Sequence, residues 1–135
     1  MARESSKTRV TQADYYNEVE RMVDLVVDGS IVVVEAGDPG EDYYILRASG
    51  GSYELEKDIV SEGEVMAAGT MVVEGNWFVK EDNMLYRLDE GVKVFVCRNS
   101  IRHLLGDLEM VKKGRRILFK VSQGQHEDIV GSLLE

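Results

Sequence analysis

The sequence predicts a mainly-β single domain with a helix near each end, and three observations support this class. Apolar and polar residues alternate with a period of two through much of 30–121. Helical periodicity is confined to the two ends of the chain, and clusters of Gly, Asn and Asp separate the apolar runs. Because the expected strands are short and follow one another closely, we expect a small, strongly bent β-barrel.

The amino-terminal part predicts a tail followed by an amphipathic helix. Residues 1–10 are polar, and we expect a disordered tail there. Thr11 offers an N-cap, and Asp14 falls in the favourable first turn. The next apolar residues recur on one helical face: Tyr15, Val19, Met22, Val23 and Val26. They predict a helix over 12–27 that ends before Gly29 and docks on its own domain or, alternatively, on a partner.

The rest of the chain predicts strands and one further helix. Six strands are expected, at 30–36, 43–48, 70–79, 84–88, 92–98 and 115–121. The alternation in 53–63 is weak, so both a strand and a long excursion remain open. We expect a single helical turn at 99–103 and a short helix at 127–134. There is no internal repeat and no linker, so 11–135 is expected to be one domain.

The overall charge and the single cysteine restrict the compartment and the partners. A net charge of −9 argues against non-specific nucleic-acid binding and is compatible with a basic partner, although acidity can also serve solubility alone. Cys97 is the only cysteine, which excludes an internal disulfide and fits a reducing compartment. The start has no signal-peptide core, and no apolar run is long enough to span a membrane. We therefore expect an intracellular protein, nuclear or cytoplasmic, with no membrane partner.

A basic cluster near the end departs from this acidic composition. It consists of Lys112, Lys113, Arg115 and Arg116. These side chains could touch a phosphate backbone locally. The alternative is a solvated turn beside a strand whose charges deter edge-to-edge pairing.

The sequence gives no constellation typical of catalysis. His103 and His126 are far apart, and neither adjoins a Ser or Cys nucleophile motif. Cys97 lies in an apolar strand and is expected to be a small buried residue. The acidic turn at 37–42 could hold a weak cation, but a turn accounts better for its composition. With no Gly-rich phosphate loop either, we expect no enzyme, no cofactor and no metal site.

Two aromatic pairs, Tyr43-Tyr44 and Trp77-Phe78, carry the strongest functional signal. Adjacent strand residues point to opposite faces, so one member of each pair belongs in the core and the other could be exposed. An exposed tyrosine and Trp77 would then form an aromatic patch with an acidic rim, suited to Arg, Lys or methyl-lysine. The expected rim residues are Asp38, Glu41, Asp42 and Asp82. The alternative is that all four aromatics are core.

Several segments resemble the small barrels of chromatin readers, namely the Tudor, chromo-barrel and bromo-adjacent homology families. Residues 29–34 and 38–48 are similar to the opening hairpin of bromo-adjacent homology domains. Residues 72–78 with 80–82 are similar to their strand that ends in Trp-Phe, and 94–102 to their strand followed by a turn. The resemblance covers about 30–102. It implies a Tudor-like barrel and a histone tail as the partner.

Together these observations predict a non-enzymatic module that binds a basic peptide or protein segment in an aromatic-acidic groove, in chromatin or a related assembly. The alternative is a structural or inhibitory interaction protein that acts through self-association or through its acidic surface. Nucleic acid is not expected as a direct ligand, and a homo-oligomer is compatible with either interpretation.

Overall fold

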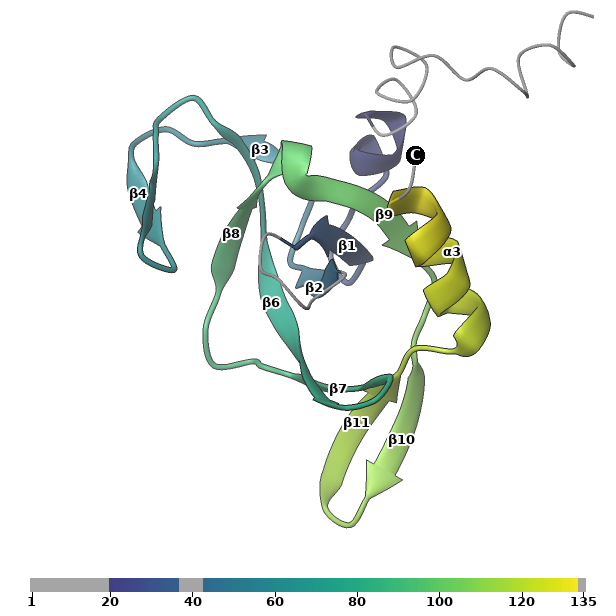
Figure 1. Ribbon diagram of the computed structural model, residues 1–135. Coiled ribbons are helices and arrows are strands. Elements are labelled where there is room, and N and C mark those ends of the chain that lie inside the picture. The colour runs from purple at the N-terminus through teal and green to yellow at the C-terminus, as the bar shows by residue number, and fades with distance from the viewer. Residues whose placement is uncertain (1–19, 37–42, 134–135) are drawn as a thin grey trace, which may run out of the picture.

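A computed structural model describes residues 20–36 and 43–133, and within these ranges the protein is mainly β (Figure 1). The strands are β1 (Ile31–Glu35), β2 (Tyr43–Ala48), β3 (Tyr53–Glu54), β4 (Ile59–Ser61), β5 (Glu64–Met66), β6 (Met71–Asp82), β7 (Leu85–Leu88), β8 (Val94–Cys97), β9 (Ile101–Leu105), β10 (Glu109–Lys113) and β11 (Arg116–Lys120). A 3-10 turn, η1 (Arg98–Ser100), precedes β9, and the helix α3 (Gln123–Leu133) follows β11.

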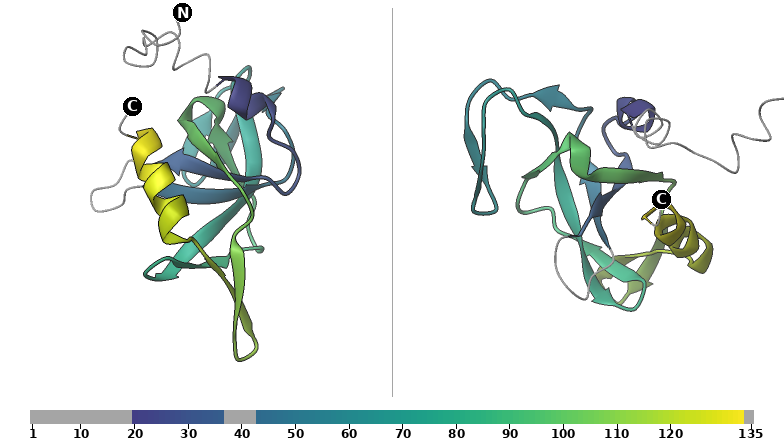
Figure 2. Two further views of the ribbon diagram at one scale, coloured as in Figure 1. Left: turned by 90° about the vertical axis from the view of Figure 1, so that its right-hand side faces the viewer. Right: turned by 45° about the horizontal axis from the view of Figure 1, so that its top comes forward.

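Nine of the described strands form one antiparallel sheet that curls around the centre of the molecule (Figures 1 and 2). The order is β10-β11-β7-β6-β2-β1-β9, and both β3 and β8 pair with β6 off this path. The hairpin β4–β5 is a separate two-stranded sheet. The long strand β6 is therefore the junction of the fold, because four other strands pair with it.

All six predicted strands are present, and the open question at 53–63 is answered by the short strands β3 and β4. The helical turn expected at 99–103 is confirmed only in part, because η1 ends at Ser100 and Ile101 starts β9. β5, β9 and β10 were not predicted. β5 is very short and β10 is rich in charged residues, so both carry little alternation, and the first residues of β9 were expected to form the helical turn. The predicted helix over 12–27 is helical at 20–24, while 1–19, including the expected tail and Thr11 cap, lies outside the described residues.

The C-terminal helix is confirmed, but it begins at Gln123 rather than near 127. Ser122 explains the earlier start, because it forms a capping box with Gln125. The Gln125 backbone N–H donates to Ser122 Oγ, and the Ser122 N–H donates to Gln125 Oε1, each at 3.0 Å. No helix within 20–36 or 43–133 is long and apolar enough to cross a membrane.

The sheet buries apolar side chains on both faces. Alternating residues of β1 and β2 divide between two clusters: Val32 and Leu46 belong to one, and Val33 and Ile45 to the other. Val23, from the segment that precedes β1, packs into the first cluster, and Ile129 of α3 packs into the second. Because the same strands contribute side chains to both clusters, a one-residue shift in strand register would move each side chain to the other cluster.

Both histidines fasten α3 to the sheet. His103 Nδ1 on β9 lies 3.0 Å from Ser132 Oγ of the helix. His126 Nδ1, on the helix itself, lies 2.8 Å from the Tyr43 hydroxyl of β2. The two histidines therefore act as polar contacts in the attachment of α3.

Gly75 on β6 is a position where a side chain has no room. An added Cβ would overlap the Arg47 carbonyl oxygen of β2 and lie 3.0 Å from Leu46 Cγ. We expect Gly75→Ala to lower the free energy of unfolding by about 1–3 kcal/mol or more, because backbone would have to move. Gly106→Ala is the matched control, since nothing lies within 4 Å of the position that its Cβ would take and it lacks a positive φ. Equal midpoints for the two variants in urea denaturation would contradict this account.

The attachment of α3 should depend on pH through His103. Burial lowers the pKa of the His103 imidazole, and the Asp128 carboxylate opposes that shift. Because the unfolded chain then binds the proton more readily than the folded one, stability should fall as pH drops through the ordinary histidine range, between about pH 7.5 and 5.5. Thermal unfolding of His103→Gln, which keeps a hydrogen-bonding side chain but does not titrate, should show a smaller loss over that interval than the wild type.

Candidate ligand-binding groove

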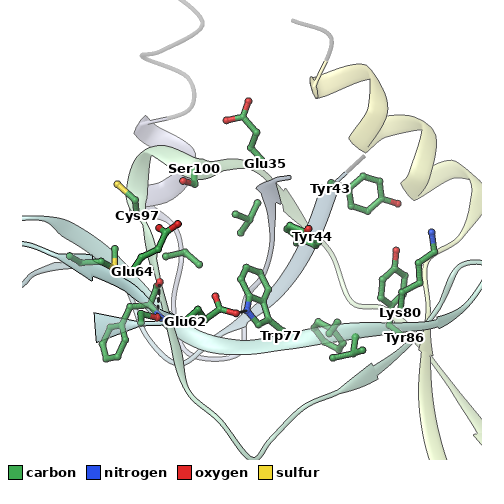
Figure 3. A pocket seen from close by; sticks show the side chains of 17 residues that line it. Glu35, Tyr43, Tyr44, Glu62, Glu64, Trp77, Lys80, Tyr86, Cys97 and Ser100 are labelled. Atoms are coloured by element: carbon green, nitrogen blue, oxygen red, sulfur yellow. Dashed lines mark hydrogen bonds between the residues drawn. The ribbon is translucent and has the colours of Figure 1, made fainter. Parts of the chain in front are cut away.

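A groove of about 830 Å³ lies between the β4–β5 hairpin and the curled sheet (Figure 3). Its lining comes from seven strands and the turns beside them, so residues far apart in the sequence meet there. The lining residues are Val34, Glu35, Tyr43, Tyr44, Ser61, Glu62, Glu64, Met66, Trp77, Phe78, Val79, Lys80, Tyr86, Phe95, Val96, Cys97 and Ser100.

An aromatic pair forms one wall of the groove. The rings of Tyr44 and Trp77 are tilted by 59° with centroids 5.7 Å apart. The β2–β6 register explains the contact: Trp77 lies opposite Leu46, so Tyr44 is its diagonal neighbour on the same face. Both side chains are half-buried, whereas their chain neighbours Tyr43 and Phe78 are buried at 8% and 6% exposure. One member of each aromatic pair is thus core and the other is partly accessible.

The carboxylate of Glu62 contacts the edge of this aromatic pair. Trp77 Nε1 donates a hydrogen bond of 3.0 Å to Glu62 Oε2, and Figure 3 shows Glu62 and Tyr44 on different sides of the Trp77 side chain. Glu62 occupies the two-residue turn of the β4–β5 hairpin with a φ of +53°, followed by Gly63 at +82°. Glutamate is uncommon in this left-handed conformation, so a strained residue supplies the contact to Trp77.

Ser61 attaches the same hairpin to β8. The Phe95 N–H donates to Ser61 Oγ at 3.1 Å, and Ser61 Oγ donates to the Phe95 carbonyl at 3.4 Å. Ser61, Glu64 and Met66 line the groove, while the cross-strand pair Val60 and Val65 faces away and is 68% and 71% exposed. Since the hairpin pairs with no strand of the main sheet within the described residues, these side-chain contacts hold it over the groove.

The groove carries more negative than positive charge. Glu35, Glu62 and Glu64 line it, against Lys80 alone among the cationic lining residues described. Glu35 is partly compensated, because Arg102 lies 2.9 Å from its carboxylate. The Glu62 carboxylate instead accepts a hydrogen bond from a neutral indole, and no cation within the described residues forms an ion pair with it. Its negative charge therefore lies uncompensated beside the aromatic pair.

The structure brings three of the predicted site residues together, since Tyr43, Tyr44 and Trp77 all line the groove. Asp82 lies at the end of β6, beside the β6–β7 turn, and it is not a lining residue. The predicted acids Asp38, Glu41 and Asp42 lie outside the described residues. Sequence reasoning missed Glu62 and Glu64, although two short apolar runs around Glu62-Gly63 form a recognisable hairpin signal.

Cys97 lines the groove as a half-buried free thiol, so it is more accessible than the buried residue expected from the sequence. Within the described ranges, no group of three or more His, Cys, Asp or Glu side chains could hold a metal ion. The groove combines an aromatic pair with carboxylates at its edge. The ring faces and the carboxylate charges can both attract a cation.

Removing the Glu62 carboxylate should loosen the hairpin without unfolding the domain. We expect Glu62→Ala to speed amide hydrogen exchange at 59–66, while global stability changes by less than about 1 kcal/mol, as is usual for one exposed contact. Glu64→Ala is the matched control, because Glu64 is an exposed neighbour on the same hairpin and is not the residue that contacts Trp77. If both variants exchange at the same rate, Glu62 does not hold the hairpin.

Comparisons with known proteins found no match: no family model matches the chain, and neither the curated proteins nor the solved structures include a significant match.

Proposed function

We propose that the protein is a non-enzymatic binding module that recognises a basic peptide or protein segment in the groove beneath the β4–β5 hairpin. The observation that carries the proposal is the Tyr44–Trp77 pair, 5.7 Å between ring centroids, with the Glu62 carboxylate 3.0 Å from Trp77 Nε1. Aromatic faces attract Lys, Arg or methyl-lysine cations, and a carboxylate beside them adds to the negative potential.

The rest of the lining suits the stem of a long basic side chain. Val34, Met66 and Phe95 add apolar side chains to the lining. Lysine and arginine bury their methylene stems on such surface while the charged head stays near polar groups. Glu35 and Glu64 then act as rim charges, which steer a basic partner and speed association more than they hold it.

We also infer that the curled sheet is a small bent barrel of the chromatin-reader type. β9 and β10 lie at the two ends of the strand order in the main sheet. Only the three residues 106–108 join them, so the two end strands are close together in the sequence. The resemblance of 30–102 to bromo-adjacent homology and Tudor-like domains favours an intracellular partner such as a histone tail. A basic segment of this kind fits the charge and the aromatic wall.

The second candidate is an interaction protein that acts through self-association. The exposed pair Val60 and Val65 on the outer face of the β4–β5 hairpin favours it, at 68% and 71% exposure. Two copies could bury these valines against each other. Val60→Ser with Val65→Ser would then reduce a dimer seen by sedimentation and leave peptide binding unchanged.

Truncating either groove aromatic should weaken binding of a basic peptide. We expect Trp77→Ala and Tyr44→Ala each to cost more than about 1 kcal/mol of binding free energy, the scale of aromatic hot spots. The measurement is isothermal titration with an array of Lys- and Arg-containing peptides, methylated and unmodified. A buried Trp→Ala can itself cost roughly 3–5 kcal/mol of stability, so unfolding curves are recorded in parallel and Tyr44→Ala provides the second readout.

The charge contribution is tested separately with a matched pair of variants. Glu62→Gln should slow association and flatten its salt dependence, because the uncompensated carboxylate beside the aromatic pair is lost. Asp82→Asn removes the same charge away from the groove lining and should change neither quantity. The proposal is wrong if no basic peptide binds the folded wild type, or if binding survives Tyr44→Ala undiminished.

A further inference from the structure

The β10–β11 hairpin projects from the body of the molecule as a two-stranded ribbon (Figures 1 and 2). Among the described strands, β10 pairs only with β11, and β11 pairs with β7 only through Phe119 and Lys120. At about 3.3 Å per residue, the turn at Gly114 therefore extends roughly 15 Å beyond the last pairing with the sheet. This ribbon is distinct from the groove, since none of its residues line it.

The ribbon carries the opposite charge to the chain as a whole. Its five cations are Lys112, Lys113, Arg115, Arg116 and Lys120, against the single anion Glu109, in a chain with a net charge of −9. All five cations are exposed. Arg116, opposite Lys113, makes an ion pair of 2.6 Å with Glu81 of β6, whereas no ion pair between described residues involves Lys112, Lys113 or Arg115.

The strand register distributes these cations over both faces of the ribbon. Lys113 and Arg116 are opposite each other and share one face, while Lys112 is opposite Ile117 on the other face. Arg115 lies in the turn itself. A flat surface could engage one of these faces at a time, whereas a cleft with negative charge on two sides could engage both.

We propose that this ribbon, with Lys112, Lys113 and Arg115 at its tip, is a second binding surface that enters a groove of duplex nucleic acid and contacts its phosphates. A two-stranded antiparallel ribbon fits the major groove, which is about 12 Å wide and flanked by phosphates on both sides. Cations on both faces of the ribbon match that geometry. The contacts expected are to phosphates, so they position the protein without selecting a sequence.

The acidic body does not prevent this contact. The sheet carboxylate that reaches the ribbon, Glu81, is already paired with Arg116 and Arg87. The Debye length at physiological ionic strength is about 8 Å, so carboxylates farther than this from the tip are largely screened. The net charge argues against adhesion of the whole molecule to nucleic acid, but the local charge at the tip has the opposite sign. A membrane is the poorer fit, because the exposed apolar residues Met110 and Ile117 lie behind a tip that is entirely charged or glycine.

The test measures binding to a fluorescent duplex of about 20 base pairs by anisotropy at several salt concentrations. We expect the wild type to bind with a dissociation constant in the range of about 1–100 μM, typical of non-specific contacts. Lys113→Gln with Arg115→Gln should raise that constant at least about tenfold at low salt. A plot of the logarithm of the binding constant against the logarithm of the salt concentration should also become shallower. Its slope should decrease by about two, one unit for each lost phosphate contact.

The matched control is Arg21→Gln with Lys57→Gln, which removes the same two charges from exposed positions away from the ribbon. It should leave the dissociation constant within about twofold and the slope unchanged. Unfolding curves establish that both double variants are folded. Failure of the wild type to bind duplex, or equal losses in the two double variants, overturns the proposal.

Two further experiments distinguish a nucleic-acid partner from a membrane or a second copy of the chain. Cosedimentation with vesicles containing anionic phosphatidylserine, in the absence of duplex binding, would assign the ribbon to membranes and overturn the proposal. Self-association that is lost in Lys113→Gln with Arg115→Gln, again without duplex binding, would assign it to a second copy of the chain and would equally overturn it. Because the ribbon and the groove share no residues, neither result bears on the peptide-binding proposal.

Discussion

The close approach of β6 to β2 at Gly75 is the constraint on which the rest of the fold depends. β6 pairs with β2 and β8 over the same stretch, so its backbone at Gly75 is paired on both sides. Only a residue without Cβ can lie against the Arg47 carbonyl there. The next residues along this strand are Asn76 and Trp77. The close approach at Gly75 therefore also positions the buried Asn76 amide and the Trp77 side chain that lines the groove.

Asn76 shows how the strand organises its surroundings beyond the sheet. Its amide, 4% exposed, donates to the Asp89 and Val92 carbonyls at 3.0 Å each and accepts from Lys93 Nζ at 3.0 Å. These three bonds satisfy a buried side chain and tie down the loop between β7 and β8. Lys93 also contacts Ser49, so the loop is connected to the end of β2 as well. β8 follows this loop, and the backbone of its Phe95 makes the two hydrogen bonds with Ser61 that attach the hairpin.

The groove therefore combines a rigid wall with a hairpin held by a few contacts. Trp77 and Tyr44 project from paired strands with cores on both faces, whereas Glu62 and Ser61 belong to a hairpin that pairs with no strand of the main sheet in the described structure. Side chains on paired strands are held in place, whereas a hairpin attached by a few side-chain contacts can open locally at a lower free-energy cost. The left-handed Glu62 in the hairpin turn places its carboxylate against Trp77 Nε1 at some cost in backbone strain.

Local chemistry in the sequence was sufficient to predict the mainly-β class, six strands and a C-terminal helix, while it left open whether each aromatic pair divides into a core and an accessible member. These features follow from the alternation of residues along one strand, and alternation is visible in the sequence. The Ser122 cap of α3 was also predictable, since a Ser followed three residues later by Gln is a capping-box signal. Strands β5, β9 and β10 were not predicted. β5 is three residues long, β10 is rich in lysine, and β9 follows directly after a helical turn whose end the sequence placed too late.

Only the tertiary structure decided which acids meet the aromatic pair. Glu62 is fifteen residues from Trp77 in the chain, and the two touch because Ser61 fastens the hairpin to β8. No periodicity encodes that contact, since it depends on how a separate hairpin docks. The projection of the basic ribbon is likewise a property of strand pairing, because β11 leaves the sheet after only two pairs with β7. Sequence patterns specify which face a side chain takes along its own strand, whereas long-range pairing and docking specify what that face meets.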